Sequence, residues 1–246
     1  MKKFSLLFIL FLWTCCIRDA AALTLGQIKV DIRQKINDRA DPKVTYSDTI
    51  MNSLINEAQR DIVNRTWCLQ KTLSQSLSTR TTYYSFPTDF IAIQEFSFKE
   101  TATNRKRLLE EKSERSLNQE NPDYERQRGP PFYYFVRNST WTDTVLEYGL
   151  NPVPSATAQL GTIYVDYYNQ PTALSSNSDI PFDSMYHLYP YHSGIIYYVV
   201  SKIKLLEGDV ASATAYNQLY EQMIALMVDR LGRAPNYNPS FGIGTH

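Results

Sequence analysis

Residues 179–231 constrain the fold more than any other stretch, because two helical periodicities meet there across a two-residue break. A helix start is expected at residues 179–183, where Pro181 and acidic side chains suit a first turn. Gly208 can take the left-handed conformation that ends one helix, and Asp209 can cap the next. Helices joined so tightly must run antiparallel, so the stretch is predicted to form a helical hairpin. Its apolar stripes are Leu188, His192, Ile195, Val199, Ile203 and Leu206, then Val210, Ala213, Asn217, Tyr220, Ile224, Met227 and Leu231.

Two further helices are expected before residue 70. The first begins at Thr24, which has the capping-box spacing to Gln27, and the second begins near residues 45–47. Each of the four helices has an apolar stripe that needs a partner, so a helix bundle is predicted. The first stripe is Leu25, Ile28, Ile32 and Ile36; the second is Ile50, Leu54, Ala58, Ile62 and Arg65, widened by Met51, Ile55 and Val63.

Between residues 70 and 178 the apolar period changes from about 3.6 to 2, which indicates strands. Short turns favour a mostly antiparallel arrangement. The alternation changes parity near Gln94 and Glu95, which predicts a β-bulge. Residues 99–128 hold 15 charged side chains and are expected to be a solvated excursion with a short helix near residues 112–118. Their basic cluster at 105–107 is interpreted as solvated loop in preference to a phosphate contact.

The predicted fold class is therefore α+β: an antiparallel helix bundle with an inserted antiparallel β domain and an extended C-terminal arm. Two N-terminal helices (23–69) and two C-terminal helices (179–231) make the bundle, and residues 70–178 make the β domain. Glycine and proline breaks exclude a helix over residues 232–246. This stretch is either a disordered end or an arm that docks on another molecule.

Residues 1–22 are typical of a secretion signal. Two lysines precede a short apolar run at residues 4–13, and three alanines at 20–22 provide small residues for cleavage. The run is too short to span a membrane. Outside this segment Cys68 is the one cysteine, and it is predicted to be a buried structural thiol.

No pattern in the sequence points to catalysis, so a protein without enzymatic activity, metal or cofactor is expected. His187 and His192 are five residues apart, whereas a helical zinc pair needs four. The sequence has no phosphate-binding glycine loop and no nucleophile elbow. The formal charge of +0 argues against non-specific nucleic-acid binding. The 18 tyrosines suit either wet interfaces or half-exposed sheet faces.

Four segments, in this order and spacing, resemble the head-to-tail adaptor (connector) proteins of short-tailed bacteriophages. They are residues 24–33 of the first helix, 54–66 of the second, 84–90 before the bulged strand, and the pair Ile180–Pro181 with residues 206–209. The resemblance implies a structural virion protein that forms a ring, usually of twelve copies, beneath the portal. Such a ring extends the DNA channel used in genome ejection and provides the platform for tail assembly.

The resemblance also implies partners: the portal protein, the nozzle or tube proteins of the tail, and further copies of the chain. DNA is expected to pass through the ring without specific binding, because a near-neutral protein neutralises few phosphates. The arm is expected to hold the portal through its proline, asparagine and aromatic residues. These are Pro235, Asn236, Tyr237, Asn238, Pro239 and Phe241.

An export signal does not suit an adaptor, which is assembled in the host cytoplasm and incorporated into the virion. Two interpretations are open. Translation can begin at Leu23, since a TTG codon encodes leucine internally and methionine when it initiates. Alternatively the signal is real, and the chain is a secreted or periplasmic, non-enzymatic binding protein whose tyrosine-rich surface holds a glycan or peptide.

Overall fold

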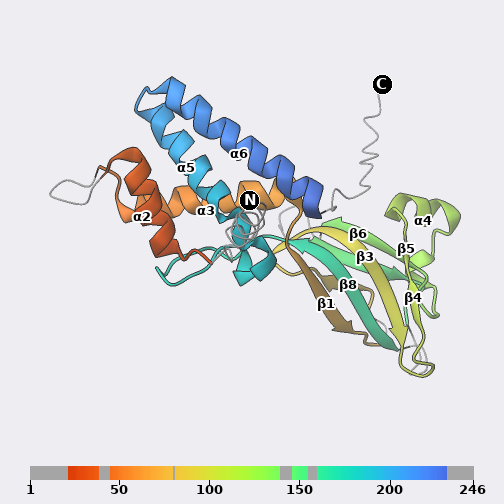
Figure 1. The fold of residues 1–246 in the computed structure, drawn as a ribbon. Helices are drawn as coiled ribbons and strands as arrows, with labels where there is room; N and C mark the ends of the chain where they lie inside the picture. Colours follow the sequence, from red (N-terminus) through yellow and green to blue (C-terminus); the bar gives the residue numbers. More distant parts are fainter. Residues whose placement is uncertain (1–21, 39–44, 80, 139–145, 155–159, 232–246) are drawn as a thin grey trace, which may run out of the picture. The chain divides into compact units, whose positions relative to one another are not determined.

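The computed structural model describes residues 22–38, 45–79, 81–138, 146–154 and 160–231. The described residues divide into two compact units. Residues 22–66 and 171–231 form one, called the helical unit, and Trp67–Gln170 form the other, called the β unit. Both helices and sheets are present, which confirms the α+β class (Figure 1).

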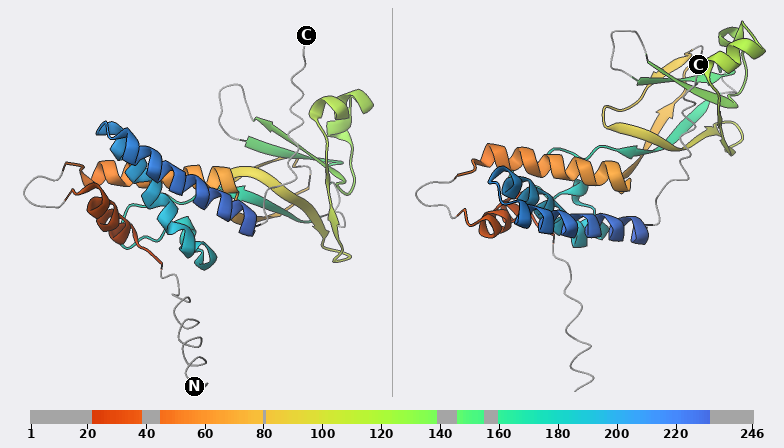
Figure 2. Two further views of the ribbon diagram at one scale, coloured as in Figure 1. Left: turned by 45° about the horizontal axis from the view of Figure 1, so that its top comes forward. Right: turned by 90° about the horizontal axis from the view of Figure 1, so that it is seen from above.

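The helical unit contains four α-helices and two short 3₁₀ segments among its described residues. Helix α5 packs against α6, α3 packs against both, and α2 packs against α5. Figures 1 and 2 show α5 and α6 lying side by side along their length. The elements are α2 (Leu25–Ile36), α3 (Asp48–Thr66), η3 (Phe182–Ser184), η4 (Tyr186–Tyr191), α5 (His192–Leu206) and α6 (Val210–Leu231).

The start of α2 has the geometry that its sequence predicts. The Thr24 hydroxyl accepts a hydrogen bond from the Gln27 backbone N–H, and the Gln27 side chain accepts one from the Thr24 N–H at 2.9 Å. This reciprocal pair satisfies two N–H groups that the first turn leaves unpaired. The predicted stripe of α2 is confirmed, because Leu25, Ile28, Ile32 and Ile36 are all buried.

The widened stripe predicted for α3 is largely confirmed, because Met51, Ile55, Ala58, Ile62 and Val63 are buried. Ile50, which the stripe included, is 47% exposed. Ile50 and Met51 both fit a spacing of three and four, so periodicity alone could not exclude Ile50 from the buried face. Packing against α5 and α6 decides the phase. The buried residues of α3 are Met51, Ile55, Ala58, Gln59, Ile62, Val63 and Thr66.

The helix start expected at residues 179–183 is wrong, because α5 begins only at His192. Three consecutive non-glycine residues, Phe182–Ser184, have positive φ values of 57°, 52° and 60°. Such a run is strained and needs tertiary support. Gln59 of α3 provides it, since its Oε1 accepts the Phe182 N–H at 2.7 Å. The Asp179 carboxylate accepts hydrogen bonds from N–H groups that precede it and so does not cap a helix.

The turn between α5 and α6 is as short as the sequence suggests. Gly208 has a φ of +80°, in the left-handed region that glycine tolerates best. The Asp209 carboxylate accepts the Ser212 N–H at 3.1 Å, a capping contact at the start of α6. The Ser201 hydroxyl donates to the Ala213 carbonyl at 3.0 Å, so residues before and after the turn face each other and the helices run antiparallel.

The β unit consists of two four-stranded sheets with their apolar side chains packed together. One sheet has the order β1-β8-β3-β4 and the other β2-β7-β6-β5. The pairing is antiparallel except between β5 and β6, which is parallel. The strands are β1 (Gln70–Ser76), β2 (Tyr83–Ser85), β3 (Phe90–Glu100), β4 (Lys106–Leu108), β5 (Glu110–Glu111), β6 (Tyr133–Asn138), β7 (Leu146–Asn151) and β8 (Gly161–Asn169).

Strand β3 is irregular, and after β4 the chain passes from one sheet to the other. The register of β3 against β8 shifts between Ile93 and Glu95, which confirms the predicted bulge, and a second shift lies between Phe90 and Ala92. The chain crosses between the sheets at Leu109. Its N–H donates to a carbonyl of β3 at 2.9 Å, whereas the next N–H donates to the carbonyl of Phe132 at 3.1 Å.

The charged stretch at residues 99–128 is more ordered than the predicted solvated excursion. It contains the end of β3, both β4 and β5, helix α4 (Glu114–Glu120) and η1 (Tyr124–Arg126). The short helix is confirmed two residues later than expected. Leu117 and Tyr124 pack on Phe135, so a few apolar residues anchor a stretch that charge alone would place in solvent.

Candidate functional site

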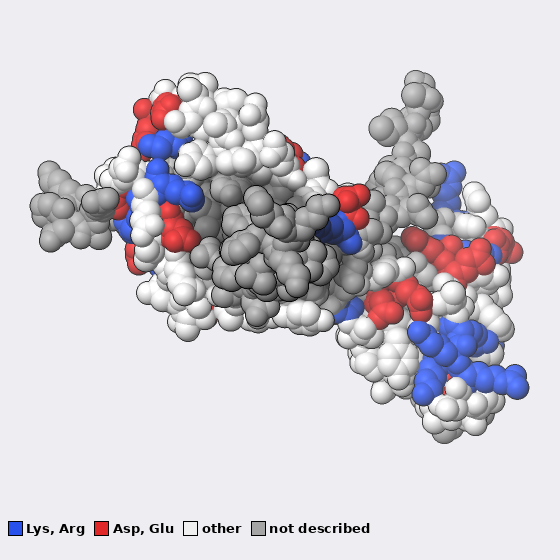
Figure 3. Space-filling view, in the orientation of Figure 1, with Lys and Arg blue, Asp and Glu red and all other residues white. Residues whose placement is uncertain are grey.

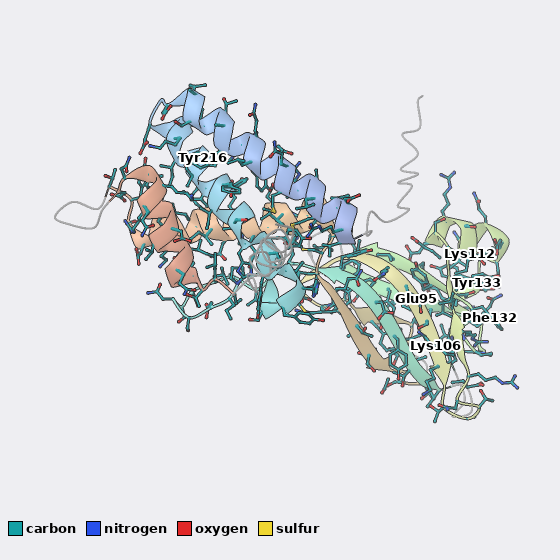
Figure 4. All side chains as sticks on the ribbon, viewed as in Figure 1. Glu95, Lys106, Lys112, Phe132, Tyr133 and Tyr216 are labelled. Atoms are coloured by element: carbon teal, nitrogen blue, oxygen red, sulfur yellow. The ribbon has the colours of Figure 1, made fainter. Side chains whose placement is uncertain are left out.

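One face of α6 has the composition of a contact surface. Only three of the 22 residues of α6 are charged, although most of the helix lies at the surface. Leu219 and Leu226, two turns apart, are 41% and 38% exposed. The partly buried Tyr216, labelled in Figure 4, lies one turn before Leu219. Low charge with exposed leucine and tyrosine is typical of the centre of a protein interface. This α6 outer face is defined by the exposed Leu219 and Leu226, which the partly buried Tyr216 and Met223 flank.

The turn between the two helices adds a second apolar surface, called the hairpin tip. Leu205, Leu206 and Val210 are 57%, 75% and 60% exposed. The sequence stripes placed Leu206 and Val210 at positions that need a covering partner, which is wrong because both side chains are exposed. An exposed cluster of large aliphatic side chains is a candidate interaction site.

Polar contacts hold α3 against the hairpin and so fix the α6 outer face. Two tyrosines and a bidentate arginine reach carboxylates on the facing helix. Burial, followed by the neighbouring carboxylate, raises the pKa of Tyr198 and of Tyr220, so both remain hydrogen-bond donors. The contacts are Tyr198 to Glu57, Tyr220 to Asp61, and Arg65 to Glu221.

His192, which the sequence placed on the apolar stripe, is fully buried at the start of α5. Its Nδ1 accepts the Leu23 N–H at 3.1 Å, so it ties the beginning of α2 to the hairpin. Burial lowers the pKa of His192 to about 4, and the ring is neutral at pH 7. Among the described residues, no group of three or more His, Cys, Asp or Glu side chains is arranged to hold a metal ion.

Most tyrosines lie in the interior or are partly covered. Tyr186 is the one described tyrosine with a largely exposed side chain, at 80%. The described residues therefore do not present a continuous tyrosine-rich ligand surface. The fully buried examples are Tyr124, Tyr134, Tyr148, Tyr167, Tyr168, Tyr191 and Tyr220.

The expected portal-binding residues, Pro235–Phe241, and residues 1–21 of the expected signal at 1–22 lie outside the described residues. Cys68 is buried, as expected. Sequence reasoning missed the α6 outer face. The spacing of Leu219 and Leu226, seven residues apart and off the main stripe, was a signal for it. Within the part of the chain that the structure describes, no helix is both long and apolar enough to cross a membrane.

The family model described as SU10 adaptor protein matches residues 23–240, almost the whole chain. The chain belongs to this family, which confirms the resemblance to phage head-to-tail adaptors. It is a structural phage protein, and the family implies association with portal and tail components in the virion. No curated protein sequence gives a significant match.

Proposed function

We propose that this adaptor forms a ring of copies, usually twelve, beneath the portal. The ring extends the DNA channel and provides the platform to which the tail attaches. The observation that carries this proposal is the family match over residues 23–240 together with a charge-poor, apolar outer face on α6.

Helices α2, α3, α5 and α6 act in this proposal as an antiparallel bundle that forms the ring wall. The α6 outer face supplies the contact between neighbouring copies, because exposed leucine gains most from removal of water. The hairpin tip is a second contact surface. Both surfaces belong to the helical unit. In this unit Tyr198 of α5 and Tyr220 of α6 donate hydrogen bonds to carboxylates of α3 and so hold α3 against the hairpin.

Portal binding is assigned to the C-terminal arm, and passing DNA is not retained. Pro235, Asn236, Tyr237, Asn238, Pro239 and Phe241 are the proposed contacts. The formal charge of +0 supports weak attraction to phosphate. Assembly takes place in the host cytoplasm.

The ring contact is tested by placing charges on the α6 outer face. Leu219→Glu with Leu226→Glu should abolish rings on the portal, because two carboxylates would be buried without partners. The matched control is Gln218→Glu with Ala225→Glu, also seven residues apart and exposed on α6 but on a different face. Light scattering of adaptor mixed with portal measures the mass. Rings that persist in the leucine variant would contradict this assignment.

A second experiment separates portal binding from folding. Deletion of residues 232–246 should leave the melting of the helical unit unchanged and abolish binding to portal rings. A truncated protein that still binds the portal would remove the arm from the proposal and leave the ring contact to be judged by the α6 variants.

A further inference from the structure

Positive charge gathers at the turn that joins β3 to β4. Lys99 and Lys106 are cross-strand partners, so two like charges lie opposite each other, and Arg105 is exposed beside them. Like charges in this arrangement destabilise a sheet. Glu95 offsets part of this repulsion through an ion pair with Lys106 at 3.0 Å, and both residues are labelled in Figure 4. Figure 3 shows the basic side chains gathered over this end of the β unit.

Arg107 lies on the other face of the same strand and is held by aromatic rings. Its guanidinium carbon is 4.4 Å from the ring centroid of Phe132 and 5.1 Å from that of Phe98. No described residue accepts a hydrogen bond from its Nε or Nη2, which are shielded from solvent. These rings fix Arg107 in place and keep its Nε and Nη2 from a partner, so attraction to carboxylates of a second molecule comes from the neighbouring Lys99, Arg105 and Lys106.

Apolar side chains accompany these cations. Leu108, which follows Arg107 in β4, is 67% exposed. Phe132, whose ring covers the guanidinium of Arg107, is 50% exposed. Arginine beside exposed aromatic and aliphatic surface is the composition of interface residues that contribute most to binding. Contact with a nucleic-acid backbone requires the cations but gives no role to Leu108.

An acidic surface occurs on the same unit, over β5, α4 and η1. Residues 110–126 carry six acidic side chains and three basic ones. Glu110 and Glu120 are exposed, and the ion pair of Glu120 with Lys112 at 2.7 Å is itself at the surface. Figure 3 shows these acidic side chains as a red band separate from the basic end. The two surfaces are complementary in charge.

We propose that the β3–β4 turn of one copy docks on the acidic β5–α4 surface of a second copy. Such a contact is heterologous, and repetition of a heterologous contact around an axis closes a ring. Arg105 and Lys99 provide attraction to carboxylates of the neighbour, and Leu108 and Phe132 are covered when the surfaces meet. The inference rests on the proposed ring and adds a charge-dependent contact to the apolar one on α6.

Charge reversal on each surface, then on both, tests the contact. Lys99→Glu with Arg105→Glu reverses the turn while leaving the pair of Lys106 with Glu95 intact. Glu110→Lys with Asp123→Lys reverses the other surface and leaves the ion pair of Glu120 with Lys112 intact. Either double variant should self-associate roughly tenfold more weakly than the native chain. The chain with all four substitutions should regain association.

The control alters net charge equally but elsewhere. Lys35→Glu with Arg60→Glu changes two exposed basic residues of the helical unit and should leave association unchanged. Sedimentation of the full chain at about 0.1 M and about 1 M salt gives the association constants, and the native value should fall with salt. A short DNA duplex is included as a second ligand for every variant.

Each outcome decides the proposal. Loss in both double variants with recovery in the fourfold variant supports it. Association that is indifferent to the reversals overturns it, as does a turn variant that loses only duplex binding. If rings still form on the portal when these charges are reversed, the proposed function stands without this contact. If the chain associates in a charge-dependent way but forms no ring on the portal, this contact stands and the proposed function does not.

Discussion

The core of the helical unit is built mainly from aliphatic side chains, whereas the core of the β unit is built mainly from aromatic rings. In the β unit Phe96 stacks on Tyr134 with centroids 4.2 Å apart, and Tyr84 stacks on Tyr148 at 5.5 Å. In the helical unit, polar side chains fasten the packed helices through hydrogen bonds to carboxylates.

This difference predicts different weaknesses. Interlocked rings fit one geometry and tolerate little added volume. Aliphatic and methionine side chains adjust more easily, so the helical unit depends more on its few buried polar groups. The surfaces differ in the same sense. The helical unit exposes leucine and valine, and the β unit exposes separated charges.

The largest expected difference between the two units comes from adding one methyl group to the core of each. A Cβ at Gly149 would lie 2.1 Å from Cζ of Phe135, a buried ring on the neighbouring strand. Gly149→Ala should therefore lower the unfolding free energy of the β unit by about 3 kcal/mol. Hydrogen exchange of the β6 and β7 amides measures the loss locally.

Gly194→Ala in α5 is the matched change in the helical unit. Its Cβ would meet Cγ of Met223 at 3.3 Å, a contact that a flexible side chain can relieve. Alanine also favours a helix over glycine by about 1 kcal/mol. The stability of the helical unit should be unchanged or raised. Equal losses in the two variants would remove the contrast between a rigid and an adaptable core.

Acid should destabilise the helical unit through His192. Its pKa of about 4 in the folded protein is below the value of 6.5 for an unperturbed histidine, so the unfolded chain binds the extra proton. The contribution of this histidine is complete above pH 6.5 and is lost as the pH falls toward 4. Between about pH 7 and pH 5 the unfolding free energy should fall by about 2 kcal/mol.

His192→Asn removes the titrating ring and keeps an acceptor for the Leu23 N–H. This variant should be less stable at neutral pH but should lose the slope between about pH 7 and pH 5. His187→Asn, a partly buried histidine of the same unit, should keep the slope. Denaturant unfolding at several pH values measures both. An unchanged slope in His192→Asn would mean that other groups control the acid response.

Local chemistry made several of these features predictable. The capping box at Thr24, the glycine turn at Gly208 and the parity change near Gln94 each depend on neighbouring residues. Features fixed by distant residues were missed. The left-handed run at Phe182–Ser184 depends on Gln59, and Arg107 is covered by Phe132, which precedes β6 of the other sheet.

The candidate site follows the same division. The exposed leucines of α6 repeat along one helix, so their spacing was visible in the sequence. Leu206 and Val210 of the hairpin tip were predicted to lie on covered stripes, because a stripe of apolar residues does not show which of its positions a partner covers. Which end of a helix remains exposed depends on the length and position of its partners, which come from other parts of the chain.

The smallest expected effect compares one buried hydroxyl in each unit. Tyr220 donates to Asp61, so Tyr220→Phe leaves a carboxylate without its donor and should cost about 1 kcal/mol. Tyr148 is fully buried in the β unit, and none of the described residues bonds its hydroxyl. Tyr148→Phe should leave stability unchanged or raise it, since a shielded hydroxyl without a partner is unfavourable. Denaturant unfolding of both variants measures the difference.

The pair also tests why the two interiors differ. If the β unit depends on ring shape, the rings of Tyr148 and phenylalanine are equivalent there, and removal of the oxygen is harmless. If the helical unit depends on polar cross-links, Tyr220→Phe should loosen α3 from the hairpin while the ring still fits. Asp61→Asn, which keeps an acceptor for the tyrosine hydroxyl, should recover most of the stability lost in an Asp61→Ala chain. Equal stability of those two Asp61 variants would show that the oxygen of Tyr220 contributes nothing to holding the helices together.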